Sequence, residues 1–184
     1  MQTLKATLDW QGRPLIIYQI EQLLATNVNQ IVVVLGFKAD ELTALIKKSK
    51  VTGRVTIATN VRYAQGRTTS IITGVRKVPT SDAVVMLSVD QPRPASVLQR
   101  LIDAHAKGKI TIPAFGDKHG HPPIYDASMR EDLLAITEGT EGLKSVNKRH
   151  EKDIRYVPFD SDAVLVNLNR PQDYEKAHAK YGIK

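Results

Sequence analysis

Hydrophobic positions along the chain switch repeatedly between two spacings. Apolar residues recur at helical spacing in residues 14–28, 39–49, 68–78, 94–108, 128–136, 142–149 and 171–181. Short runs rich in β-branched residues, typical of strands, occupy residues 30–36, 54–60, 82–90, 109–115, 121–126, 154–160 and 163–168. Strands that alternate with helices favour a mostly parallel sheet with helices on both faces. The pattern therefore predicts an α/β fold with helix, sheet and helix layers.

The length and composition of the chain narrow its class. Its 184 residues fit a single domain spanning residues 1–184, and no linker or repeat divides the pattern. Cysteine is absent, so we expect neither a disulfide nor a thiolate zinc site. No apolar run approaches the ~18 residues that a membrane span needs, so we expect a soluble, cytoplasmic protein without a membrane partner. The oligomeric state is left open.

The charge of the chain favours anionic ligands. Lys and Arg number 26 against 19 Asp and Glu, which gives a net charge of +7. Such a bias suits nucleotides or nucleic acid. The basic residues are scattered rather than gathered in one arm, and aromatic residues make up only 5% of the chain. We therefore expect a small anionic ligand rather than DNA or RNA.

A carboxylate stands where one of the buried runs stops. The segment "VVMLSVDQPRP" (84–94) ends its apolar run at Asp90, and Pro92 and Pro94 prevent the strand from continuing. Open α/β sheets bind their ligands beyond the carboxyl ends of the strands. Asp90 is thus a candidate ligand for the Mg²⁺ of a nucleotide triphosphate. The alternative is that Asp90 caps the helix that begins near Pro94.

Several segments resemble, in order, the motifs of MobA-like nucleotidyltransferases. "VVMLSVDQP" is similar to the family's Leu-x-Gly-Asp-Gln-Pro segment, and "LKATLDWQGRPLI" is similar to its Lys-x-x-Leu-x-x-x-Gly-x-Pro-Leu segment. The remaining similar segments are residues 31–42, 60–74, 120–126, 139–146 and 164–174. The resemblance covers nearly the whole chain and is closest to the molybdenum cofactor cytidylyltransferase branch.

This resemblance implies a Rossmann-like fold of the nucleotide-diphospho-sugar-transferase type. It also implies Mg²⁺-dependent transfer of CMP from CTP, or of another nucleotide, to a molybdopterin-type acceptor, with release of pyrophosphate. It places Asp90 and Lys5 in catalysis, and Asp90 with Asn167 at the metal. It assigns contacts with the nucleotide or the acceptor to Lys5, Asn60, Gly66, Arg67, Ser70, Gln91 and Pro92.

Departures from the family pattern keep a non-catalytic nucleotide- or cofactor-binding protein of the same fold as an alternative. Asn167 and Asn169 stand where the cytidylyltransferases have aspartates, which weakens a Mg²⁺ site, although an amide oxygen can still ligate. The family's first strand and Gly-rich phosphate loop have no counterpart after Met1. That strand would lie between residues 30–36 and 82–90, so we expect unpaired strand edges there and an impaired activity.

Some polar residues admit two interpretations. Arg67 and Arg170, at positions that more often hold methionine and threonine, either contact phosphate or are solvated. His119 and His121 suggest a metal pair, but no carboxylate accompanies them at diagnostic spacing, so we favour a hairpin turn. Residues 68–70 precede a helical pattern and either bind an anion or cap the helix, and the resemblance favours substrate contact.

Overall fold

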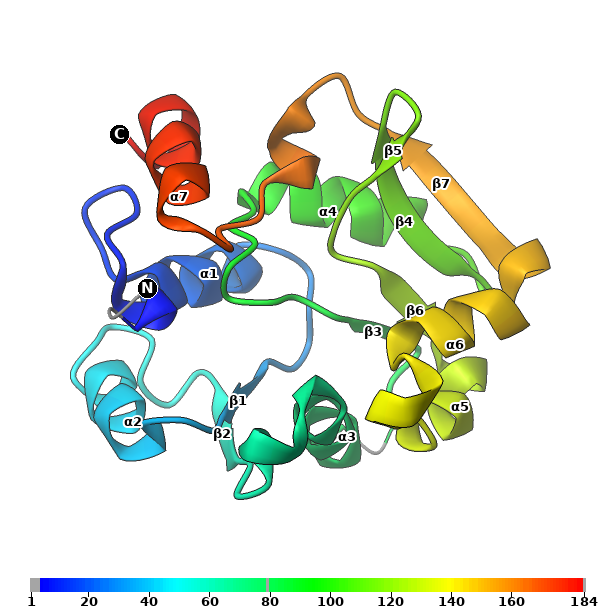
Figure 1. Ribbon diagram of the computed structural model, residues 1–184, viewed down its shortest axis with the longest axis horizontal. Helices are drawn as coiled ribbons and strands as arrows, with labels where there is room; N and C mark the ends of the chain where they lie inside the picture. The colour runs from blue at the N-terminus through cyan, green and yellow to red at the C-terminus, as the bar shows by residue number, and fades with distance from the viewer. Residues whose placement is uncertain (1–3, 79, 184) are drawn as a thin grey trace.

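A computed structural model describes residues 4–78 and 80–183 as an alternation of helices and strands (Figure 1). The helices are α1 (Leu15–Leu24), α2 (Ala39–Lys47), α3 (Arg67–Lys77), α4 (Ala95–Ala104), α5 (Arg130–Leu134), α6 (Leu143–Arg149) and α7 (Pro171–Ala177). The strands are β1 (Val32–Leu35), β2 (Thr56–Thr59), β3 (Ala83–Val85), β4 (Ile110–Phe115), β5 (Lys118–His119), β6 (Ile124–Asp126) and β7 (Ile154–Pro158). Each segment of helical spacing in the sequence contains one of these helices.

The strands form two sheets. β1 and β2 pair in parallel as one sheet. In the other, β3 pairs antiparallel with β6, and β6 pairs antiparallel with β4. β4 also pairs antiparallel with β5 and parallel with β7. The larger sheet is therefore mixed, where the sequence predicted a mostly parallel one. The reason is that the chain reverses in the β4–β5 hairpin and returns beside β4 as β6.

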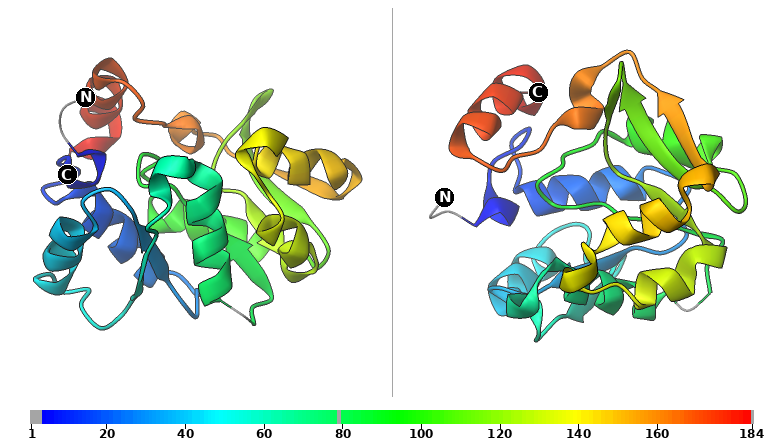
Figure 2. Two further views of the ribbon diagram at one scale, coloured as in Figure 1. Left: turned by 60° about the horizontal axis from the view of Figure 1, so that its bottom comes forward. Right: turned by 45° about the vertical axis from the view of Figure 1, so that its right-hand side comes forward.

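Helices cover the strands in two groups. α1 packs against α4, while α3 packs against β1, β2 and α5 (Figure 2). Buried side chains of α1, β1 and α2, such as Ile17, Leu35 and Ile46, form one part of the core. Burial of such apolar surface is the main force that holds the layers together. The layered α/β fold predicted from the sequence is confirmed. No helix in the described part of the chain is long and apolar enough to cross a membrane.

β3 is shorter than the sequence predicted, because the segment before its partner strand β6 has no backbone N–H groups to donate. The last link of the ladder runs from the Met86 N–H to the Pro123 carbonyl, at 3.0 Å. The residues that precede β6 are Pro122 and Pro123, which have no N–H group. The chain therefore leaves the sheet after Val85, and Asp90 lies in a turn of the following loop rather than at the last residue of a strand.

Residues 163–168 do not form the predicted strand. Residues Asp162–Leu165 form a 3₁₀ turn, which begins where the Ser161 hydroxyl accepts a hydrogen bond from the Ala163 N–H. The backbone carbonyls of Val164 and Val166 accept hydrogen bonds from the buried Arg93 side chain, so they are not available to a neighbouring strand. An apolar run predicts burial, but it does not by itself distinguish a strand from a buried turn.

β1 and β3 each have one edge that faces no strand. Within residues 4–78 and 80–183, β1 pairs only with β2, and β3 pairs only with β6. Val33 and Val84, in the middle of these strands, are only half-buried. The unpaired edges expected between residues 30–36 and 82–90 are therefore present in the described part of the chain.

The carboxyl-terminal helix docks on the amino-terminal segment. The Tyr174 hydroxyl of α7 donates to the Asp9 carbonyl at 2.9 Å. The buried Trp10 ring meets Tyr18 of α1, with ring centroids 6.3 Å apart, and meets His178 edge-on at 5.9 Å. Two distant parts of the chain therefore share one aromatic cluster.

Candidate functional site

The loop that carries Asp90 is held in place by a glutamine of α1. Gln19 is only 5% exposed, and its amide N–H₂ donates to the carbonyls of Ser88 (3.0 Å) and Gln91 (2.9 Å). Its amide oxygen accepts from the Arg93 N–H at 3.1 Å. Satisfied polar groups of this kind fix a buried loop, since leaving any of them unpaired is costly. The loop therefore presents Asp90 from a fixed backbone.

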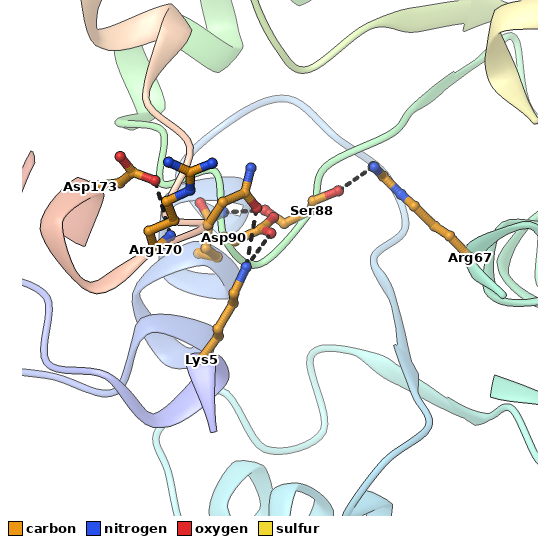
Figure 3. Close-up of polar contacts among 8 residues, drawn as sticks. Lys5, Arg67, Ser88, Asp90, Arg170 and Asp173 are labelled. Atoms are coloured by element: carbon orange, nitrogen blue, oxygen red, sulfur yellow. Dashed lines mark hydrogen bonds and ion pairs between the residues drawn. The ribbon is translucent and has the colours of Figure 1, made fainter. Parts of the chain in front are cut away.

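Asp90 lies in a small polar cluster with Lys5 and Asn169 (Figure 3). The Lys5 ammonium donates to the Asp90 carboxylate at 3.1 Å and to the Asn169 amide oxygen at 3.2 Å. The Leu168 N–H donates to the Asp90 carbonyl at 2.8 Å, which ties the segment after residue 166 to the same loop. The cluster joins a cation, a carboxylate and an amide oxygen from three distant parts of the sequence. The Lys5 and Asp90 side chains stay 31% and 23% exposed, so a ligand can reach them.

Asn167 lies next to this cluster in the chain but makes a different contribution. Its amide oxygen is buried and has no hydrogen-bond partner among the described residues, whereas Asn169 contacts Lys5. The side-chain oxygen of Gln91 is likewise buried and unpartnered in residues 4–78 and 80–183. Such buried acceptors are uncommon and mark places where a cation, a water or a ligand donor would be stabilised.

The donors at this site suit a divalent cation that arrives with a nucleotide. Nowhere in the described ranges do three or more His, Asp or Glu side chains gather closely enough to hold a metal ion. Mg²⁺ is commonly held by one or two carboxylates together with substrate phosphates and waters. Asp90 provides one carboxylate, and the unpartnered Asn167 oxygen is a candidate for a further neutral ligand. The residues present therefore fit nucleotide-bound Mg²⁺, but not a cage made by the protein alone.

The two arginines singled out in the sequence take different positions. Arg67, at the start of α3, reaches across to the Ser88 hydroxyl at 2.5 Å, which brings its guanidinium to the loop that carries Asp90 (Figure 3). Arg170 acts through its backbone, because its N–H donates to the Asp173 carboxylate at the start of α7, at 2.9 Å. Arg67 therefore adds an exposed cation near the cluster.

Asn60 and Ser70 are joined to one another. The Asn60 amide donates to the hydroxyls of Thr69 (2.8 Å) and Ser70 (2.9 Å), and its oxygen accepts from the Arg62 N–H at 3.0 Å. Asn60 is 3% exposed. The hydrogen-bonding groups of its side chain are thus used to hold the end of β2 against the start of α3. The contact with substrate expected for these two residues stays a prediction.

The amino terminus of α3 contacts a carboxylate of the same chain, that of Glu138. The Thr68 N–H donates to the Glu138 carboxylate at 2.7 Å, and this bond lowers the pKa of Glu138. Gly66, at φ 114°, precedes the helix, and a Cβ at this position would lie 2.4 Å from the Glu138 carboxylate. Residues 68–70 therefore behave as the capped end of a helix, with Glu138 as the cap.

Arg93 is the main functional residue that the sequence patterns did not reveal. Its side chain has no exposed surface, and it donates to four backbone carbonyls, those of Pro92, His121, Val164 and Val166. These bonds join the Asp90 loop, the loop before β6 and the segment that leads to Asn167. The only sequence signal is a basic residue between two prolines beside an apolar run, which is weak because such a residue is usually solvated.

An open groove of ~580 Å³ lies at the carboxyl ends of β1 and β2. Gly36, Lys38, Asp40, Asn60 and Tyr63 are among the residues that line it. The carboxyl ends of parallel strands are where open α/β sheets bind ligands. The lining of this groove combines the Tyr63 ring with one cation, Lys38, which pairs with the Glu41 carboxylate at 2.9 Å.

Residues 1–154 match the family described as the MobA-like NTP transferase domain. The chain belongs to the MobA-like NTP transferase family. A curated relative, the nicotine blue oxidoreductase of Paenarthrobacter nicotinovorans, is 26% identical over 148 residues, which cover 76% of this chain and 71% of the relative.

Solved structures of similar fold include a nucleotidyl transferase of Methanothermobacter thermautotrophicus, with TM-score 0.81, 21% identity and coverage of 96% and 84% of the two chains. A manganese complex of the Mycobacterium tuberculosis protein Rv0371C has TM-score 0.76, 20% identity and coverage of 94% and 89%. The molybdopterin-guanine dinucleotide biosynthesis protein A of Archaeoglobus fulgidus has TM-score 0.64, 19% identity and coverage of 97% and 91%. At these identities the likeness shows the fold.

Membership of the MobA-like NTP transferase family makes the chain a nucleotidyltransferase by type. The family resemblance stated from the sequence motifs is thus confirmed. Family members act on nucleotide triphosphates and commonly use divalent metals.

Proposed function

We propose that this MobA-like protein transfers CMP from CTP to a molybdopterin-type acceptor and releases pyrophosphate, with Mg²⁺ as the metal. The observation that carries the proposal is the cluster of Lys5, Asp90 and Asn169, in which a cation and two side-chain oxygens from three parts of the chain meet beside the loop after β3. The likeness to the Archaeoglobus protein named for molybdopterin-guanine dinucleotide biosynthesis supports an acceptor of this class.

In this reaction an oxygen of the acceptor's phosphate attacks the α-phosphorus of CTP. A new P–O bond forms there, and the bond between the α-phosphorus and the bridging oxygen to the β-phosphate breaks, so that pyrophosphate leaves with its electron pair. Few protein groups need to change protonation, because the chemistry depends mainly on positioning and on neutralising charge. Lys5 and Arg67 supply positive charge, and the loop held by Gln19 fixes where Asp90 lies.

Asp90 is the residue that would hold Mg²⁺, together with the amide oxygen of Asn167. The ion, when bound with the nucleotide, supplies charge neutralisation at the phosphates. Lys5 donates to Asp90 and Asn169 in the structure, and the third N–H of its ammonium group can donate to a phosphate oxygen when the nucleotide is present. Asn169, which also accepts from Lys5, helps to hold the ammonium group beside Asp90.

The test is a transfer assay with α-labelled nucleotides. The protein is incubated with Mg²⁺, molybdopterin and either CTP, GTP or ATP, and labelled product and pyrophosphate are measured. We expect product with CTP in preference to the other nucleotides, and none with Asp90→Asn. Absence of product with every nucleotide, in protein that still binds CTP, would overturn the proposed reaction.

A second candidate is a non-catalytic nucleotide- or cofactor-binding protein of the same fold. Asn167 and Asn169, which replace the aspartates of the cytidylyltransferases, favour it because fewer charges are left to hold Mg²⁺. The oxidoreductase name of the Paenarthrobacter relative supports a cofactor-binding role as well. The same assay separates the candidates, since this one predicts nucleotide binding with no release of pyrophosphate.

A further inference from the structure

Arg67 is a cation that has no carboxylate partner and lies beside the Asp90 loop. Its guanidinium donates to the neutral Ser88 hydroxyl at 2.5 Å, and it forms no ion pair within residues 4–78 and 80–183. A guanidinium carries five N–H donors in a planar fork that matches the oxygens of a phosphate. One neutral acceptor leaves most of these donors to solvent or to a ligand, so the exposed Arg67 side chain is able to bind an anion.

The contact with Arg67 is not what holds Ser88 in place. The Ser88 carbonyl accepts from the Gln19 side chain at 3.0 Å and from the Gln91 N–H at 3.1 Å. Gln19 is buried, so the backbone of the loop is fixed from α1 and not from α3. The guanidinium can therefore exchange the Ser88 hydroxyl for a ligand while the loop keeps its conformation.

Lys5 and Arg67 reach this loop from two different sides (Figure 3). Lys5 donates to the Asp90 carboxylate, whereas Arg67 donates to Ser88, two residues earlier in the chain. Two residues of extended chain span at most ~7 Å, so a phosphate held by Arg67 would lie close to the backbone of Asp90. Two cations on two sides of one loop suit a reaction in which two phosphate groups meet.

The surroundings of Arg67 on its other side include a cleft. Burial lowers the pKa of His121, and the Arg93 and Arg67 cations lower it further. Burial raises the pKa of the Tyr125 hydroxyl, and the Arg67 charge opposes this change. His121 lines a cleft of ~450 Å³, and so does Asn147, which accepts from the Tyr125 hydroxyl at 2.9 Å. Arg67 is thus within electrostatic reach of a hollow large enough for a small second substrate.

Two other charged side chains border this region. The Glu138 carboxylate accepts from the Thr68 N–H at 2.7 Å, and this bond, with a smaller effect from the Arg67 charge, lowers the pKa of Glu138. Glu138 is therefore engaged by the start of α3 and forms no ion pair with Arg67 in the described ranges. Lys148 lines the cleft and adds positive charge there. The balance of charge around Arg67 favours an anionic ligand.

We propose that Arg67 binds the phosphate monoester of the acceptor and restricts the reaction to acceptors that carry such a group. The identification of this phosphate as the acceptor's rests on the proposed function. Bidentate contact with the guanidinium holds two of the three non-bridging oxygens and leaves the third to attack the α-phosphorus. Lys5, which bonds to the candidate metal ligand Asp90, serves the triphosphate. Because the family more often has methionine at this position, the contact would be a property of this chain.

The first experiment measures binding to the intact protein without transfer. The probes are α-glycerol phosphate, which is a simple phosphate monoester, glycerol as its uncharged counterpart, and CTP with Mg²⁺. The variants are Arg67→Met, Arg67→Lys, Ser88→Ala and Lys5→Met. Arg76→Met, an exposed arginine near the other end of α3, is the matched control. Thermal unfolding of each variant verifies that it is folded.

We expect the parent protein to bind α-glycerol phosphate and not glycerol. Arg67→Met should weaken binding of the monoester at least about tenfold and binding of CTP with Mg²⁺ less than about threefold, because the loss concerns charged hydrogen bonds to one phosphate. Arg67→Lys keeps the charge without the fork and should lie between the parent and Arg67→Met. Lys5→Met should show the reverse pattern, with the larger loss for CTP. Ser88→Ala and Arg76→Met should leave monoester binding within about twofold of the parent.

Three results would overturn the inference. One is a lack of monoester binding by the parent, or binding that Arg67→Met leaves unchanged. Another is an equal loss of CTP binding in Arg67→Met, since Arg67 would then serve the triphosphate. The third is an equal loss of monoester binding in Ser88→Ala, which would mean that Arg67 acts only by holding the loop.

A second experiment separates this inference from the proposed function. In the transfer assay, Arg67→Met should raise the KM for molybdopterin at least about tenfold and leave the KM for CTP within about threefold. A parent protein that transfers no CMP, but whose variants change monoester binding as expected, would reject the proposed reaction and leave the phosphate site assigned. Transfer with the same KM for molybdopterin in Arg67→Met and the parent would do the reverse.

Discussion

A charged guanidinium with no exposed surface is the least expected residue of this molecule. Burial lowers the pKa of Arg93 to about 10, so the group stays protonated at neutral pH. It is tolerated because each arm meets a carbonyl oxygen and because the negative charge of Asp90 lies nearby. Its four carbonyl partners belong to the segments that bring Asp90, His121 and Asn167 into one region. Arg93 is a positioning residue in this sense.

The first prediction concerns Arg93→Met. The variant keeps much of the side-chain volume but leaves several buried carbonyls without a donor, so we expect it to lose about 3 kcal/mol of unfolding free energy. Urea unfolding of the variant and of Arg76→Met, an exposed arginine on α3, provides the comparison. An Arg93→Met midpoint as close to the parent as that of Arg76→Met would contradict the role described here.

The second prediction concerns Asp90→Asn. The change keeps the size of the side chain and removes the charge that holds a hard cation, so Mg²⁺-dependent CTP binding should weaken at least about tenfold. Folding should change by less than ~1 kcal/mol, because the side-chain contact of Asp90 is a partly exposed pair with Lys5. Titration calorimetry with and without Mg²⁺ measures the first effect, with Asp103→Asn on α4 as the control. Unchanged affinity in Asp90→Asn would falsify the metal role and leave Asp90 as a turn residue.

The sequence located some of these residues and missed others for physical reasons. Asp90 and Lys5 stand out because a carboxylate and a lysine occur at fixed places in recognisable segments. The resemblance assigned Asn167 to the metal, but the contact between Asn169 and Lys5 was not predicted, because it depends on how a non-repetitive segment turns its side chains. Arg93 left only a weak signal and Gln19 left none, since a polar residue within an apolar pattern predicts exposure unless its partners are known.

At the scale of elements, periodicity predicted the helices well, and it was less reliable for the short strands. Helices such as α1 and α2 carry several turns of apolar spacing, which leaves little ambiguity. Residues 163–168 were expected as a strand, and the structure forms a 3₁₀ turn there because Arg93 takes the carbonyls that a neighbouring strand would need. Such competition between a side chain and a strand cannot be read from local sequence.

The third prediction concerns the contact between α5 and α6. The Asp132 carboxylate pairs with Arg149 and accepts from the His150 ring at 2.6 Å, and the hydrogen bond with His150 lowers the pKa of Asp132. A lowered carboxyl pKa contributes stability above its unfolded value of ~3.9, and this contribution is lost as the pH falls through the folded pKa. Asp132→Asn should therefore lower Tm by ~2–4 °C near neutral pH, which corresponds to at most ~1 kcal/mol.

The measurement for Asp132→Asn is a pair of melting curves near neutral pH and in acid. The difference from the parent should shrink towards zero as the pH falls through the lowered pKa of Asp132, because both proteins then lack the carboxylate charge. Asp160→Asn, an exposed position, is the control and should show little difference at either pH. A difference for Asp132→Asn that persists unchanged into acid would mean that packing, and not the ion pair, joins α5 to α6.

At the scale of the whole molecule, the site is assembled from both ends of the chain. The family match ends at residue 154, yet Asn169, which lies beyond it, accepts from Lys5 near the amino terminus. The aromatic cluster of Trp10 and His178 joins the same two regions. These contacts favour a single domain over residues 1–184, which stays a prediction.

The fourth prediction concerns the unpaired edges of β1 and β3. A version of the protein extended at its amino terminus by a strand and a Gly-rich loop should pair with both edges and place phosphate donors near Lys5. Both Tm and CTP affinity should then rise together, with ~2–4 °C for each kcal/mol gained. Calorimetric melting and CTP titration of the two versions measure these changes. An extension that altered neither quantity would count against a strand between β1 and β3.

Trp10 also gives the protein an optical reporter. It is the sole tryptophan of the sequence, and its ring is buried against His178 just after α7. Indole emission shifts to the red when water reaches the ring, and an adjacent imidazole quenches it. Fluorescence excited at the red edge of the absorption band therefore follows the opening of the cluster in which Trp10 joins α1 to the segment after α7. Tryptophan emission, compared with circular dichroism of the sheets, shows in the unlabelled protein whether these contacts of Trp10 are lost before the sheets unfold.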